Sequence, residues 1–218
     1  MSNPPPAKRA RASAATDDAH HSANPDFLAE ALQHLPPQHL KGLITQTFLR
    51  HPDALIPSLA ERSKAPARNF DHLSKSCWKE LNITHKRLSL SQQYQISGEV
   101  SEVLESACGT ILKGVTESPR YESKLSGLET LRKISKSILL CDLGQIRHEI
   151  MGGGSQTIDV ISNAMVSILN TLNDGEREKF GQEEELIKGI KWVNNEMERY
   201  SIEEYAKVVA ILDGMLGI

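Results

Sequence analysis

Apolar residues that recur at steps of three and four constrain the fold of this chain more than any other feature. From residue 70 to the end, Leu, Ile and Val repeat at this spacing, as in Ile158, Ile161, Met165 and Ile168. The spacing lines one face of a helix, and no segment shows the sustained alternation of a strand. The pattern predicts an all-α fold, with residues 70–218 forming an antiparallel bundle of about six helices.

Breaks in the apolar pattern divide this bundle. We expect helices over 70–81, 91–117, 125–139, 146–151, 155–172, 186–197 and 202–216. Ser155 is a good N-cap, and Ser201 with Glu204 forms a capping-box pattern. The run Gly152-Gly153-Gly154 could suggest a phosphate cradle, but it lacks the lysine of a Walker loop, and a flexible connection is favoured.

The N-terminal quarter has a different character. Residues 1–24 hold few large apolar side chains, and we expect them to be a disordered basic tail. Residues 25–62 predict three short helices separated by prolines, too few residues for an independent core. We therefore expect them to pack on the rest of the chain or to form a homodimer, with residues 63–69 as a linker.

Charge is unevenly distributed, although the net charge is only −3 and no nucleic-acid partner is expected. The stretch 62–87 carries seven bases and two acids, and the stretch 174–218 carries eleven acids and six bases. These stretches predict contact surfaces of opposite sign, unless both are solvated helix faces. The predicted basic contact surface consists of Arg62, Lys64, Arg68, Lys75, Lys79, Lys86 and Arg87.

The three cysteines, Cys77, Cys108 and Cys141, are far apart in the sequence. Their spacing fits neither a disulfide framework nor a zinc site, and each is expected to be a small buried residue on a helix in a reducing compartment. No apolar run approaches the length of a membrane span, and no secretory segment follows Met1. These features predict a cytosolic or nuclear protein.

Lys8-Arg9-Ala10-Arg11 is the sharpest short motif. An extended, accessible segment of this kind suits a nuclear import receptor such as importin alpha, which seats Lys and Arg stems in its pockets. Such clusters also arise by chance in solvated tails, so the motif alone is a weak signal.

Motifs that carry catalytic chemistry are not evident. We find no metal-ligand spacing, nucleophile motif or cofactor loop, and we expect a protein that is not an enzyme and holds no metal or cofactor. A polar cleft lined by acids or histidines would reopen the enzymatic interpretation.

The order of these motifs resembles the fungal nuclear proteasome-tethering factor family. The basic tail precedes Leu35-Pro36, then Leu40 with Leu43-Ile44, then Phe48-Leu49-Arg50-His51-Pro52, a basic linker and a long helical domain. The clearest likeness covers residues 35–59, and the general layout extends it over most of the chain.

The resemblance implies a dimeric, non-catalytic adaptor that shuttles from the cytoplasm and tethers proteasomes in the nucleus. It implies an import signal at Lys8, Arg9 and Arg11, and a six-helix bundle similar to the 14-3-3 fold that contacts the nuclear envelope. The implied dimerisation residues are Leu32, Leu35, Leu40, Leu43, Ile44 and Phe48.

Lysine content sets this chain apart from the family. Members can carry a lysine-rich N-terminus whose ubiquitylation supports proteasome contact, whereas Lys8 is the only lysine before Lys41 here. Direct binding is therefore favoured. The alternative function is a helical scaffold that docks on anionic membrane, or on another nuclear partner, through its basic stretch.

Overall fold

The computed structural model describes residues 36–51, 65–152 and 156–217, and the chain divides into two compact units, residues 1–55 and 56–218. Helices are the regular elements throughout these described ranges, and no strand occurs in them, which confirms the predicted all-α fold. The predicted tail, the first and third short helices, and Ser155 lie outside the described residues.

In the first unit, helix α2 spans Pro37–Arg50. Pro37 suits the first turn because its missing N–H needs no partner there. The helix ends before His51, which precedes Pro52, since a residue before proline is disfavoured in the helical conformation. This confirms the second of the three short helices predicted within residues 25–62.

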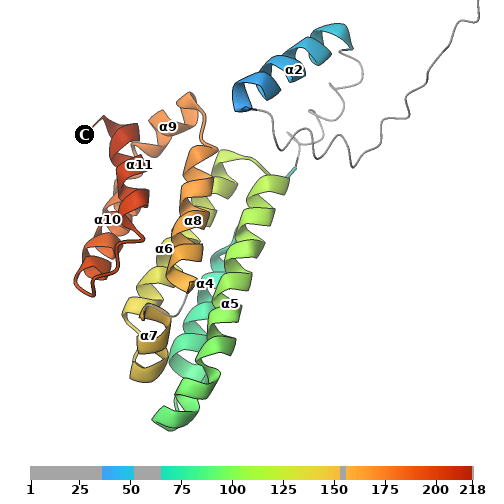
Figure 1. Ribbon diagram of the computed structural model, residues 1–218. Coiled ribbons are helices and arrows are strands. Elements are labelled where there is room, and N and C mark those ends of the chain that lie inside the picture. Colours follow the sequence, from blue (N-terminus) through green and yellow to red (C-terminus); the bar gives the residue numbers. More distant parts are fainter. Residues whose placement is uncertain (1–35, 52–64, 153–155, 218) are drawn as a thin grey trace, which may run out of the picture. The chain divides into compact units, whose positions relative to one another are not determined.

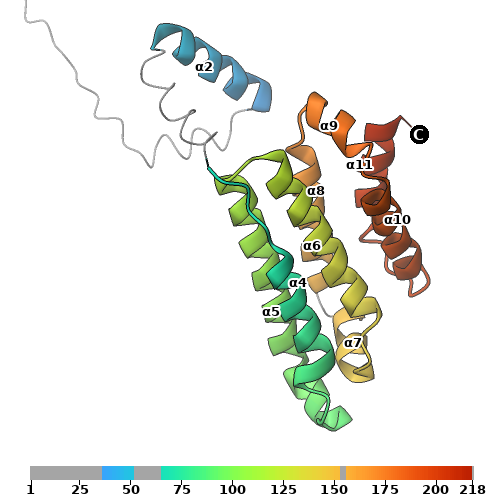
Figure 2. The ribbon, with the colours of Figure 1, turned by 180° about the vertical axis from the view of Figure 1, so that it is seen from behind.

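The second unit is a helical bundle, shown from opposite sides in Figures 1 and 2. Six of its α-helices have nine or more residues: α4 (Asp71–Lys79), α5 (Leu90–Glu117), α6 (Tyr121–Leu139), α8 (Thr157–Asn170), α10 (Glu184–Glu198) and α11 (Ala206–Leu216). Shorter pieces connect them: the π-helical turn η1 (Glu80–Thr84), α7 (Gly144–Met151) and α9 (Asp174–Phe180).

These six helices form two layers of three. One layer runs α4–α6–α10 and the other α5–α8–α11, with α6 and α8 packed against each other at the centre. Helices α5 and α8 lie toward the viewer in Figure 1, and α4 and α6 in Figure 2. The core is continuous between the layers, and Leu128, Leu131, Ile134 and Ile138 of α6 are fully buried in it. Each such side chain contributes about 1.5–3 kcal/mol through burial. Because α6 contacts helices of both layers, it is the central element of the bundle.

All three cysteines are buried and free, as predicted. Burial raises the pKa of Cys77 to about 11 and that of Cys108 to about 12. Cys141 lies just after α6 rather than on a helix, and its thiol donates a hydrogen bond to the Leu81 carbonyl at 3.0 Å. The bond ties the end of α6 to the π-helical turn.

Helix α9 was not expected from the sequence. Its seven residues include one buried apolar side chain, Phe180, so no periodic signal exists. The helix starts at a capping box between Asn173 and Glu176, and the Glu176 carboxylate also pairs with the Lys124 ammonium at 2.7 Å. Both charged side chains are almost completely buried. Lys124 also donates to the Thr171 carbonyl, so this pair fixes α9 against α6.

The prediction that Ser201 starts the last helix is wrong. Ser201 has a left-handed backbone, with φ of 60°, and its N–H donates to the Glu198 carbonyl. The Ile202 N–H donates to the Met197 carbonyl at 3.1 Å. This pair of bonds is a Schellman motif, so Ser201 ends α10. Helix α11 begins later, after Tyr205.

The predicted linker at 63–69 is partly packed on the bundle. The Pro66 carbonyl accepts a hydrogen bond from Ser118, the Arg68 N–H donates to Ser123, and Arg68 pairs with Glu117 at 2.6 Å. Residues 66–69 therefore belong to the folded second unit.

Candidate functional site

A groove on the outer face of the α4–α6–α10 layer combines exposed apolar side chains with lysines. It lies between α4 with η1 on one side and α6 on the other, and it has a volume of about 690 Å³. The two helices run in the same direction, because Asp71 meets Lys133 near one end and Leu81 meets Cys141 near the other. The groove therefore follows both helices along their length.

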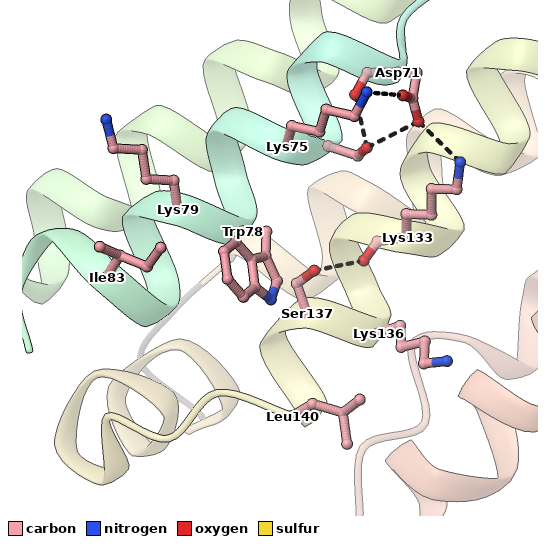
Figure 3. A pocket seen from close by; sticks show the side chains of 10 residues that line it. Asp71, Lys75, Trp78, Lys79, Ile83, Lys133, Lys136, Ser137 and Leu140 are labelled. Carbon is pink, nitrogen blue, oxygen red and sulfur yellow. Dashed lines mark hydrogen bonds and ion pairs between the residues drawn. The ribbon is translucent and has the colours of Figure 1, made fainter.

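Three large apolar side chains, Trp78, Ile83 and Leu140, line the groove with about half of their surface exposed. Trp78 lies outside the core, whereas Leu81, three residues later, is buried in it. Figure 3 shows the Trp78 indole at the centre of the groove, beside Ser137.

The π-helical turn explains why Trp78 and Ile83 share this face. Residues five apart in an α-helix point about 140° away from each other. A π-helical turn forms backbone hydrogen bonds between residues five apart, and it therefore brings such residues closer to the same face of the helix. The turn over Glu80–Thr84 thus places Ile83 on the groove side while Leu81 stays in the core.

Four lysines surround these apolar side chains: Lys75 and Lys79 from α4, and Lys133 and Lys136 from α6 (Figure 3). Asp71 is the one acid among the lining residues. Its carboxylate lies 2.8 Å from Lys75 and 2.9 Å from Lys133, and hydrogen bonds from both hold its pKa at about 2. Four cations and one anion leave the lining with a net charge of +3.

Lys79 and Lys136 have no carboxylate partner among the residues that the structure describes. The Lys136 ammonium instead lies 5.6 Å from the ring of Trp192 on α10, a cation–π distance. Neither ammonium is therefore neutralised by a carboxylate in the described part of the chain, and that of Lys136 lies over an aromatic ring.

A second cleft, between α6 and α10, shares Lys136 with the groove. Its three acids balance its three bases, and Arg132 binds Glu129 through two hydrogen bonds of 2.8 and 2.7 Å. Of these two clefts, the α4–α6 groove is therefore the one with an excess of positive charge.

The predicted basic contact surface is brought together only in part. Lys75 and Lys79 line the groove, Arg68 pairs with Glu117, and Lys86 and Arg87 are exposed in the turn after η1. Arg62 and Lys64 lie outside the described residues. Sequence reasoning missed Lys133 and Lys136, because they lie in a distant segment that tertiary packing brings beside α4.

The predicted dimerisation residues on α2 share one helical face. Leu43, Ile44 and Phe48 are exposed in the single chain, and Leu40 is half-buried. Leu32, Leu35 and the predicted import signal at Lys8, Arg9 and Arg11 lie outside the described residues.

Within the described ranges, no group of three or more His, Cys, Asp or Glu side chains is arranged to hold a metal ion. In the same part of the chain, no helix has both the length and the apolar character needed to cross a membrane. No protein-family model, curated protein or solved structure matches this chain.

Proposed function

We propose that the protein is a dimeric, non-catalytic adaptor that tethers proteasomes in the nucleus and reaches the nucleus through importin alpha. The exposed apolar face of α2 is the structural observation that carries this proposal. That helix falls where the sequence resembles the dimerisation segment of the tethering family, and exposed apolar faces of this kind commonly mark protein contacts.

The basic tail supports the nuclear part of the proposal. Lys8, Arg9 and Arg11 supply the charges that an import receptor recognises, and they precede α2 in the sequence. The folded bundle then presents surfaces for cargo. In this scheme the tail, α2 and the bundle have separate roles in import, pairing and cargo contact.

The proposal is tested by affinity purification of the tagged protein from nuclear extract, with mass spectrometry of the bound proteins. We expect proteasome subunits together with importin alpha. A variant with Lys8, Arg9 and Arg11 changed to Ala should lose importin alpha and nuclear accumulation. The matched control changes Lys113, Arg120 and Arg199 to Ala, which removes the same charge from exposed positions of the bundle outside the predicted basic contact surface. Nuclear accumulation and sustained proteasome localisation in the tail variant would contradict the mechanism.

The alternative is docking on an anionic membrane. It is favoured by the exposure of Lys79, Lys86 and Arg87 close in sequence to the exposed Ile83. Each base near such a surface contributes about 1 kcal/mol, so several could give measurable binding. Liposome flotation at low and at physiological salt separates the two functions. If the protein binds no liposomes at either salt concentration, membrane docking is excluded.

A further inference from the structure

We propose that the α4–α6 groove binds an acidic amphipathic helix of a partner protein. Apolar side chains of that helix would contact Trp78, Ile83 and Leu140, and its carboxylates would meet Lys79 and Lys136. The proposal goes beyond the adaptor function, because it gives the chemistry of a bound segment and does not require the cargo to be the proteasome.

The length of the groove suits a short helix. Its lining runs from Asp71 to Ile83 along α4 and η1, which at 1.5 Å per residue is about 18 Å. About twelve residues of helix have the same length. A helix laid parallel to α4 and α6 can therefore place two or three apolar side chains, at steps of three or four, along the groove.

Hydrogen bonding inside the groove favours a helix over an extended peptide. Apart from the Trp78 indole N–H, the uncharged polar groups of the lining are the hydroxyls of Ser74 and Ser137. Each hydroxyl donates to a carbonyl of its own helix, those of Asp71 and Lys133. An extended strand would find little with which to pair its backbone. A helix satisfies its backbone internally and needs only side-chain contacts.

Charge determines the composition of the partner. Asp71 is already engaged by Lys75 and Lys133, whereas Lys79 and Lys136 lack a carboxylate partner in the described part of the chain. These two lysines project from opposite walls of the groove, with Trp78 between them (Figure 3). A helix with carboxylates flanking its apolar face would therefore meet a cation on each side.

The concave shape favours a protein helix over a lipid surface. Trp78 and Leu140 lie within a groove between two helices, whereas residues that insert into a bilayer project from a convex face. A free inorganic anion would leave the apolar side chains uncovered. A helix covers the apolar side chains and neutralises the lysines at once.

The test is titration of the purified chain with a synthetic peptide of about 15 residues that forms a helix of about 22 Å. The peptide carries Leu at positions three and four apart and Glu elsewhere. Calorimetry measures the affinity, and fluorescence of Trp78 in a Trp192→Phe background locates the contact. Two control peptides have either the same composition with the Leu pattern scrambled, or Gln in place of Glu.

We expect binding that weakens as salt is raised and at least tenfold weaker binding by the Lys79→Glu/Lys136→Glu variant. Trp78→Ser/Leu140→Ser should lose binding to a similar degree. The matched controls are Lys113→Glu/Arg120→Glu, which changes the charge by the same amount, and Leu90→Ser/Tyr94→Ser. Both change exposed residues outside the groove and should bind normally. Circular dichroism and urea midpoints establish that every variant is folded.

Three results would overturn the inference: no binding of the acidic peptide, equal binding of the scrambled peptide, or equal losses in the groove and control variants. Vesicles of equal parts phosphatidylserine and phosphatidylcholine test whether the groove binds a lipid surface instead. If they shift Trp78 fluorescence and the peptide does not, the groove is a lipid surface. Proteasome recovery from nuclear extract is measured separately, so failure of the tether function and failure of the groove inference are distinguishable.

Discussion

Among the described residues, Ser201 is the one non-glycine residue with a positive φ. Helix α11 ends in the same left-handed conformation at Gly217, with φ of 69°. Serine pays a steric cost in this region that glycine does not, because its Cβ approaches the neighbouring carbonyl. The same backbone shape is thus formed at one helix end with the favoured residue and at the other without it.

Ser201→Gly should therefore raise the free energy of unfolding by about 0.5–1 kcal/mol. Urea denaturation followed by circular dichroism measures the change. Ser106→Gly, in the interior of α5, is the matched control and should lower stability by about 0.5 kcal/mol. A loss of stability in Ser201→Gly would mean that the serine makes a compensating contact.

The buried pair of Lys124 and Glu176 makes a second prediction at this scale. Removing one partner of a buried ion pair leaves the other charge uncompensated, which costs about 3–5 kcal/mol. We expect Lys124→Met to lower the free energy of unfolding by about 3 kcal/mol, since Glu176 remains almost fully buried. The measurement is again urea denaturation.

A double-mutant cycle separates the pair from simple packing. Glu176→Gln keeps the shape of the side chain and its bond to the Asn173 N–H while removing the charge. In that background Lys124→Met should cost at least about 1 kcal/mol less than in the native chain. Equal costs in both backgrounds would show that the lysine contributes independently of the Glu176 charge, through its hydrogen bond to the Thr171 carbonyl and its packing.

At the scale of elements, the glycines of α5 predict opposite outcomes on one helix. A Cβ at Gly114 would lie 2.5 Å from Cε1 of Phe70, a buried side chain, so the start of α4 can approach only because this residue is glycine. Gly109, on the same helix, has no atom within 4 Å of such a Cβ.

Gly114→Ala should lower the free energy of unfolding by about 1–3 kcal/mol, because the Phe70 ring must move. Gly109→Ala should raise it by about 0.5–1 kcal/mol through helix propensity alone. Thermal or urea unfolding of the two variants tests both predicted changes in stability. A gain of stability in Gly114→Ala would show that Phe70 is loosely packed.

Periodicity predicted the long elements because each buries a continuous apolar face. Helices α5, α6, α8 and α10 fall close to their predicted ranges for this reason. Helix α9 has one buried apolar residue and is held by a cap and the Lys124–Glu176 pair, which an apolar pattern does not register. Ser201 followed by Glu204 fits a capping box as a pattern, and the glycine that usually signals a Schellman motif is absent at Ser201.

At the scale of the whole molecule, the groove could be predicted only in part. The basic stretch pointed to Lys75 and Lys79. Lys133 and Lys136 lie some fifty residues further along, and the alignment of α4 with α6 follows from core packing. Apolar spacing over residues 70–81 does not show that Trp78 is exposed, and the π-helical turn cannot be recognised from apolar spacing alone.

Pairing of two copies through α2 is the prediction that concerns the whole assembly. Ile44→Asp places a charge in the exposed apolar face and should convert a dimer into a monomer, as measured by multi-angle light scattering over a range of concentrations. Gln46→Asp adds the same charge to another exposed position of α2 and should remain dimeric. A monomeric native chain, or a dimer that survives Ile44→Asp, would contradict pairing through α2.

The burial of every native thiol has a practical consequence for following this protein in solution. Cys77, Cys108 and Cys141 belong to α4, α5 and the end of α6, and each is hidden from solvent. Alkylation of a given cysteine must therefore await opening of its own segment, and mass spectrometry of labelled peptides would give three separate opening rates from one experiment. A cysteine introduced at Thr47, which is exposed on the same face of α2 as Leu43 and Ile44, would be the one readily reactive thiol of the folded chain, so oxidation would cross-link paired copies through α2 alone.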